Sequence, residues 1–165
     1  MIWIGVDPGA TGAMAFLFGN SRRRNVFDAF CPKMYDLLDA IRDSGLPAFG
    51  LVEEYIPIRN VITACKLAHN AGVLFGLLDM SRVQVSTVKV GEWRAMFGIA
   101  IPAGSKLSPK QRQTTLKKMA LKKARELFPT LAHRLDKEGN DGRAEALLIA
   151  YYARETYKGQ LEENK

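Results

Sequence analysis

The sequence has few cysteines and histidines, only two of each among 165 residues. Cys31 and Cys65 lie far apart and form no Cys-x-x-Cys pair, which argues against a thiolate zinc site and favours two reduced thiols over a structural disulfide. His69 and His133 are isolated histidines, and the sequence assigns a general-base role to neither. A bound metal would therefore have to be held by carboxylates.

Long apolar runs and a basic leader are also lacking. We expect no stretch that approaches the ~20 apolar residues of a membrane span. The first four residues read directly as the start of a strand, without a signal peptide or cleavage site. We therefore expect a cytoplasmic protein with no membrane partner. The length suits one domain with a substantial core and is too short for two ordinary domains.

Positive charge is present in excess, and one segment carries it. The net charge is +7 and the sequence pI is about 9.5. Between Lys106 and Lys137 there are ten Lys and Arg but only two acids, whereas the remainder has fourteen Lys and Arg and fifteen acids. Such a block favours a polyanionic partner, nucleic acid first. A solvated basic helix face that maintains solubility is the alternative, and charge alone does not separate the two.

Hydrophobic periodicity predicts one α/β domain with a mixed sheet flanked by helices. Strands are expected at residues 2–6, 13–18, 24–30, 48–52 and 83–88, and helices at 32–43, 60–80, 92–97, 110–128 and 141–157. The first two strands form a hairpin around a Pro-Gly turn. We expect the domain to span residues 1–157 and residues 158–165 to form a flexible tail.

Carboxylates follow two of the apolar strands and begin the last helix. Asp7 ends the first strand, and Glu53 and Glu54 follow the strand at 48–52. Because side chains alternate along a strand, only one of these glutamates can share a face with Asp7, and the period does not say which. Asp141 and Glu145 are four residues apart, so they share one helix face. The plainer alternatives are a turn-capping Asp7, solvated glutamates and an N-capping Asp141.

Hard oxygen donors of this kind suit Mg²⁺ or Mn²⁺. Two such ions about 4 Å apart can clamp the attacking and leaving oxygens of an in-line displacement. In a basic protein, this combination points to metal-dependent phosphodiester cleavage.

Three motifs together resemble the RuvC family of Holliday-junction resolvases, in the ribonuclease H-like superfamily. They are Gly5-Val6-Asp7-Pro8-Gly9-Ala10-Thr11-Gly12, Leu51-Val52-Glu53-Glu54 with the helix that follows, and Asp141-Gly142-Arg143-Ala144-Glu145-Ala146-Leu147-Leu148. The last motif is most similar to bacteriophage-type members. It departs from the bacterial pattern, which has two Asp three residues apart.

The resemblance implies a ribonuclease H-like, mixed five-stranded sheet and a structure-selective DNA endonuclease. It implies Asp7, Glu53, Asp141 and Glu145 as catalytic metal ligands, and it selects Glu53 over Glu54. It also implies two Mg²⁺ ions per site, with Mn²⁺ as a substitute. The partners would be branched DNA (four-way junctions, and possibly forks and flaps) and a second copy of the chain in a homodimer. If the protein is phage-encoded, its compartment is the host cytosol.

The resemblance also gives roles to the basic segment and to the helix at 60–80. Phosphate contacts are expected from Lys106, Lys110, Arg112, Lys117 and Lys118, together with Lys122 and Lys123. Tyr55 lies where bacterial members place an aromatic wedge against DNA. The apolar stripe of the 60–80 helix is the expected dimer face, with an ordinary core helix as the alternative.

Three other functions remain open at this point. A ribonuclease H-like nuclease that acts on RNA or RNA–DNA hybrids would use the same acids. A non-catalytic module that binds branched DNA could retain the fold. Residues 5–12 also resemble the phosphate loop of actin-like kinases, but those proteins need two such domains, which 165 residues cannot supply.

Overall fold

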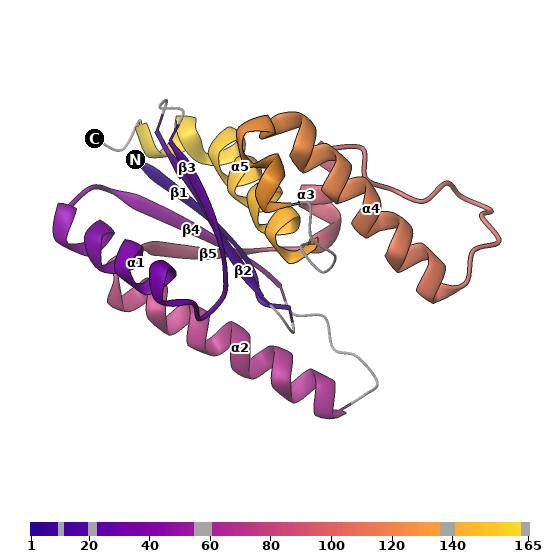
Figure 1. The fold of residues 1–165 in the computed structure, drawn as a ribbon, viewed down its shortest axis with the longest axis horizontal. Coiled ribbons are helices and arrows are strands. Elements are labelled where there is room, and N and C mark those ends of the chain that lie inside the picture. The colour runs from indigo at the N-terminus through magenta and orange to yellow at the C-terminus, as the bar shows by residue number, and fades with distance from the viewer. Residues whose placement is uncertain (10–11, 20–22, 55–60, 136–140, 163–165) are drawn as a thin grey trace.

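The computed structural model of the chain describes residues 1–9, 12–19, 23–54, 61–135 and 141–162. They form a central sheet with helices on both faces, and α1 and α2 lie on the face opposite α3, α4 and α5 (Figure 1). The mixed five-stranded sheet expected from the sequence is confirmed.

The sheet is built from β1 (Ile2–Asp7), β2 (Ala13–Phe18), β3 (Arg24–Asp28), β4 (Ala48–Glu53) and β5 (Gln84–Val88), in the spatial order β3-β2-β1-β4-β5. The first three strands are antiparallel neighbours. β4 pairs in parallel with β1, and β5 pairs in parallel with β4. The carboxyl ends of β1, β4 and β5 therefore meet at one edge, where α/β sheets commonly bind ligands.

Alternating side chains of the central strands feed two separate cores. Ile2, Ile4 and Val6 of β1 pack with α1 (Pro32–Ser44) and α2 (Val61–Met80). Trp3 of β1 and Leu51 of β4 instead face α3 (Val90–Met96), α4 (Pro109–Leu127) and α5 (Asp141–Glu162). Because both faces are covered, these strands read as continuous apolar runs in the sequence.

Helix α5 lies directly against β1, and Gly5 permits that approach. A Cβ atom on Gly5 would lie 2.2 Å from the carbonyl oxygen of Ala146 and 2.2 Å from the amide nitrogen of Ala150. No real contact is that short, so any side chain at this position would push the helix off the sheet. The close packing fixes the N-terminal end of α5 over the carboxyl end of β1.

Helix α2, expected as the dimer face with an ordinary core helix as the alternative, is mostly exposed in the single chain. Only Leu74 and Leu78 are buried, while Val61 and Ile62 are each 71% exposed. The expectation that no stretch is apolar enough to span a membrane is wrong, since this 20-residue helix, with a mean hydropathy of 1.5, meets that criterion by length and composition. The core-helix alternative fails for its N-terminal part, which leaves a broad apolar surface exposed.

Element boundaries differ from expectation where local geometry intervenes. β3 ends at Asp28 rather than at residue 30, because the chain turns at Phe30, which has a left-handed φ of 63° and lies two residues before the proline that starts α1. A 3₁₀ helix, η1 (Pro129–Arg134), occupies a stretch expected as loop. α5 continues to Glu162, past the expected end at residue 157, with Lys158 paired to Glu155 at 2.9 Å.

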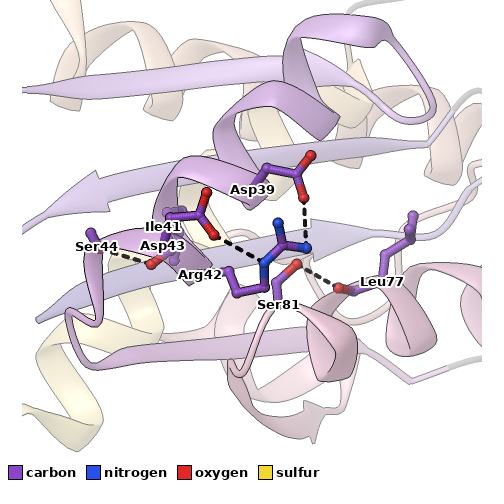
Figure 2. A network of polar contacts seen from close by, with 7 residues as sticks. All are labelled: Asp39, Ile41, Arg42, Asp43, Ser44, Leu77 and Ser81. Atoms are coloured by element: carbon purple, nitrogen blue, oxygen red, sulfur yellow. Dashed lines mark hydrogen bonds and ion pairs between the residues drawn. The ribbon is translucent and has the colours of Figure 1, made fainter.

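Polar contacts at the end of α1 illustrate how acids distant from the sheet edge are neutralised. Arg42 pairs with Asp39 at 2.9 Å and with Asp43 at 3.2 Å (Figure 2). The Ser44 hydroxyl donates to the Ile41 carbonyl at 2.7 Å, and the Ser81 hydroxyl does the same to Leu77 at 2.8 Å. The α1 residues precede β4, and Leu77 and Ser81 precede β5, so these contacts lie at the ends of the helices and at the opposite end of β4 from Glu53.

Candidate functional site

Asp7 and Glu53 are side by side at the carboxyl ends of two parallel strands. The register pairs Val6 with Val52, so the next residues along each strand, Asp7 and Glu53, are neighbours. Because side chains alternate along a strand, Asp7 and Glu53 lie on the same face of the sheet as Leu51, which faces α5. The Glu54 carboxylate instead accepts a hydrogen bond from the Thr87 hydroxyl at 3.2 Å. The strand pairing therefore places Glu53, not Glu54, beside Asp7, as the motif resemblance implied.

The start of α5 brings the other two acids to the same place. A Cβ atom on Gly142 would lie only 2.8 Å from Oδ2 of Asp7, so the first turn of α5 sits directly on that carboxylate. Asp141 precedes this glycine, and Glu145 lies one turn further along the helix. Glu145 is 6% exposed, one of the few polar residues buried among the described residues. Its burial excludes the plain surface role considered from the sequence.

Burial, together with nearby negative charge, perturbs the two strand acids. Burial raises the pKa of Asp7 to about 7, and the charges of Glu145 and Glu53 add to the effect. Burial and the charge of Glu145 likewise raise the pKa of Glu53 to about 7. The amide of Gly9, which donates to Oδ1 of Asp7 at 2.9 Å, opposes the shift at Asp7. The charge of Glu145 acts on both strand acids, which agrees with a shared, shielded site.

Two consecutive residues of α3 contact two of these acids. The indole Nε1 of Trp93 donates to Oε2 of Glu53 at 2.8 Å. The guanidinium of the next residue, Arg94, pairs with Oε1 of Glu145 at 2.6 Å. Trp93 is fully buried in the core between the sheet and α5, which anchors this short helix against the site.

Lys117 of α4 neutralises the remaining acid. Its ammonium forms an ion pair with Oδ2 of Asp141. Partial burial works against the charge on Lys117, but its bond to Asp141 and the nearby charges of Glu145 and Asp7 outweigh burial and raise its pKa. Each helix acid is thus paired with a cation, whereas the two strand acids crowd each other.

The donor set suits a hard divalent cation, although the four carboxylates are not gathered into a closed ligand cage. Within residues 1–9, 12–19, 23–54, 61–135 and 141–162, no three His, Cys, Asp or Glu side chains converge as a metal-binding group. Asp141 and Glu145 are each paired with a basic side chain, Lys117 and Arg94 respectively. The chemistry still fits Mg²⁺ or Mn²⁺, because all four candidate ligands are carboxylates and two of them repel each other.

The basic residues expected to bind DNA line α4 and the loop before it. Lys106, Lys110, Lys118 and Lys122 are exposed. The Arg112 guanidinium donates to the carbonyls of Ser105 at 2.6 Å and Leu107 at 3.1 Å, so it holds the loop in place. Lys123 pairs with Glu126 at 3.5 Å.

A shallow hollow on α4 is lined by Lys118, Leu121, Lys122, Arg125 and Glu126. Tyr55 lies outside the described residues, and its contact with DNA stays a prediction.

Sequence reasoning missed the two α3 residues that contact the acids. Trp93 and Arg94 come only a few residues after β5, whose last residue Val88 pairs with Glu53 in the sheet. A helix that directly follows a strand beside the acid-bearing one was the available signal. Lys117 was expected at the DNA backbone, and the structure places it on Asp141. His69 on α2 and His133 on η1 are both exposed.

Two solved structures share this fold over nearly the whole chain. RuvC from T. thermophilus in complex with a Holliday junction substrate aligns with a TM-score of 0.59 and 16% identity, covering 94% of this chain and 97% of that one. A further Thermus thermophilus RuvC structure aligns with a TM-score of 0.51 and 18% identity, covering 94% and 96%. No protein-family model matches the sequence, and no curated protein matches it either. The expected ribonuclease H-like α/β fold is confirmed, and bacteriophage type stays a prediction.

Proposed function

We propose that the protein is a structure-selective endonuclease that cleaves branched DNA, four-way junctions first, by metal-dependent phosphodiester hydrolysis. The observation that carries the proposal is the pairing of Asp7 with Glu53 at adjacent strand ends, beneath the first turn of α5. Carboxylates this crowded are costly without a cation to neutralise them. The RuvC-like fold, the basic α4 and the motif resemblance all agree with this activity.

Asp7, Glu53, Asp141 and Glu145 would hold the metal, proposed as two Mg²⁺ ions with Mn²⁺ as a substitute. When bound, such ions supply a water-derived nucleophile and stabilise the leaving 3′ oxygen. The chain's own contribution is positional. Gly9 fixes one oxygen of Asp7, and Trp93 fixes one oxygen of Glu53. Oriented carboxylates avoid the rearrangement that a flexible site would need before reaction.

The exposed lysines of α4 would bind the DNA backbone next to this site. Lys117 connects the two regions, because it belongs to α4 and pairs with Asp141. Phosphate contacts position DNA without reading its sequence, so selectivity for branches would come from shape. Two active sites are needed to cut both strands of a junction, and a homodimer would supply them. The exposed apolar surface of α2, including Val61 and Ile62, is the surface proposed for that contact.

The test compares three substrates and one variant. Purified protein in Mg²⁺ should cleave a synthetic four-way DNA junction faster than an RNA–DNA hybrid or a structured RNA. Asp7→Asn should abolish cleavage and retain junction binding, whereas Asp36→Asn, at an exposed site on α1, should behave like wild type. Faster cleavage of the hybrid or the RNA would reassign the substrate. Full junction cleavage by Asp7→Asn would overturn the metal-ligand assignment, and junction binding without cleavage in any divalent ion would indicate a non-catalytic module.

A further inference from the structure

Arg94 forms an incomplete ion pair with Glu145. Its Nη2 atom lies 2.6 Å from Oε1 of Glu145, and the two side chains are only 20% and 8% exposed. Among the described residues, the buried Nε of Arg94 has no hydrogen-bond partner. A buried donor without a partner is destabilising, so this geometry leaves one hydrogen-bond donor of the guanidinium unsatisfied.

Another arginine in the same helix layer shows what a structural pair looks like in this protein. Arg143 donates from Nε and Nη2 to both oxygens of Asp28, at 2.6 and 2.5 Å, and from Nη1 to the Arg134 carbonyl at 3.0 Å. That bidentate ion pair connects α5 to β3. The pair between Arg94 and Glu145, in contrast, has a single hydrogen bond and lies in the acid cluster. The two residues are 51 positions apart in the sequence.

The position of Arg94 gives its charge a further consequence. Its neighbour Trp93 is anchored on Glu53, and the charge of Arg94 acts on Glu53 as well as on Glu145. The guanidinium therefore lies where a positive charge is needed to hold these carboxylates together. A divalent cation that enters the cluster would compete with it for Glu145.

We propose that Arg94 is a positioning residue that acts as a built-in counter-ion: it holds Glu145 in the metal-free protein and yields that carboxylate when a divalent cation binds. The proposal rests on the metal site of the proposed function. Arg94 then raises the metal concentration at which the site fills, because an ion that takes Glu145 as a ligand must displace the guanidinium from it. Removing the arginine removes a competitor and leaves an unneutralised acid, and both changes favour metal binding.

The test is calorimetric measurement of Mn²⁺ binding to metal-free protein. Arg94→Gln should bind Mn²⁺ at least about tenfold more tightly than wild type, which corresponds to about 1.4 kcal/mol. Arg94→Lys, which keeps the charge, should stay near wild type. Arg154→Gln is the control, since the Arg154 side chain is 22% exposed, close to the 20% of Arg94, and pairs with Glu155 at 2.8 Å away from the acid cluster. In a Glu145→Gln background, the further change Arg94→Gln should increase the Mn²⁺ affinity by much less than it does in wild type, because only the weaker action of the Arg94 charge on Glu53 remains.

Equal or weaker Mn²⁺ binding by Arg94→Gln would overturn the proposal, as would absence of binding in both proteins. A second measurement uses wild type alone, in case the variant does not fold. The side-chain ¹⁵Nε–H resonance of Arg94, assigned with Arg94→Lys, should shift on addition of Mg²⁺, and an unchanged resonance would count against the proposal. Junction cleavage measured on the same preparations separates the two ideas. Tighter Mn²⁺ binding by Arg94→Gln without cleavage of any substrate would support the counter-ion role and contradict the nuclease activity. Junction cleavage by wild type without tighter Mn²⁺ binding by Arg94→Gln would support the nuclease activity and contradict the counter-ion role.

Discussion

Replacing Asp7 with Asn is expected to stabilise the metal-free protein at neutral and higher pH, although it removes a proposed ligand. The pKa of this carboxyl is raised from 3.8 to about 7 by burial and by the charges of Glu145 and Glu53. The folded chain therefore keeps the Asp7 proton to a higher pH than the unfolded chain does. The contribution of Asp7 to stability is full below about pH 4 and declines as the pH rises to about 7.

The size of the stability difference between Asp7→Asn and wild type follows from this rise in the pKa of Asp7. Between about pH 5 and pH 7 the unfolded carboxyl is ionised and the folded one is protonated, which costs about 1.4 kcal/mol for each pH unit. The advantage of Asp7→Asn over wild type should therefore grow by about 2–3 kcal/mol between pH 5 and pH 8. For a domain of this length, each kcal/mol moves the melting temperature by roughly 2–4 °C.

The assay is chemical or thermal denaturation of both proteins with a chelator present, at several pH values across this range. Asp36→Asn, on the exposed side of α1, is the control and should show no such growth. A wild-type stability that is flat from pH 5 to pH 8, or an advantage of Asp7→Asn that does not change with pH, would refute the view that crowded carboxylates destabilise the metal-free site.

Three further variants test the packing, the orientation of Glu53 and the basic surface. Gly5→Ala should destabilise the fold by about 3 kcal/mol or more, because its Cβ would lie 2.2 Å from backbone atoms of α5; a melting temperature like that of wild type would contradict the close contact. Trp93→Phe removes the hydrogen bond that lowers the pKa of Glu53, so that pKa should rise above its present value of about 7 and metal binding should need a higher pH; an unchanged pH profile of Mn²⁺ binding would argue against this role. Lys118→Ala should reduce the salt dependence of junction binding by roughly one unit of log–log slope, and an unchanged slope would place Lys118 away from the phosphates.

Much of the site could be predicted because its acids follow strong local signals. Apolar runs identify β1 and β4, and the acids at their ends identify the sheet edge. The choice between Glu53 and Glu54 could not be made from the sequence of the strand. Alternation shows that the two side chains point to opposite faces, but it does not show which of the two faces Asp7 shares. The register of β4 against β1 decides it, and register is a property of the pairing rather than of either strand.

The parts that could not be predicted depend on long-range contacts. The apolar stripe of α2 is compatible with burial against the sheet or with exposure, and only the position of the helix relative to the sheet shows that Val61 and Ile62 are exposed. Arg94 and Trp93 reach carboxylates 51 and 40 residues away, and nothing in the local pattern around them marks such contacts. Lys117 is one of many lysines on α4, and the packing of α4 on α5 selects it to meet Asp141.

The central claim is that Glu53, on the face of Asp7, is a ligand of the catalytic metal, whereas its neighbour Glu54 is not. The most direct measurement is cleavage of a four-way DNA junction in Mg²⁺ by Glu53→Gln and by Glu54→Gln, with Mn²⁺ binding followed in parallel. The two variants make the same chemical change at adjacent positions. The geometry predicts that Glu53→Gln loses cleavage and weakens Mn²⁺ binding while Glu54→Gln retains both. Wild-type cleavage by Glu53→Gln, or equal losses in the two variants, would contradict it.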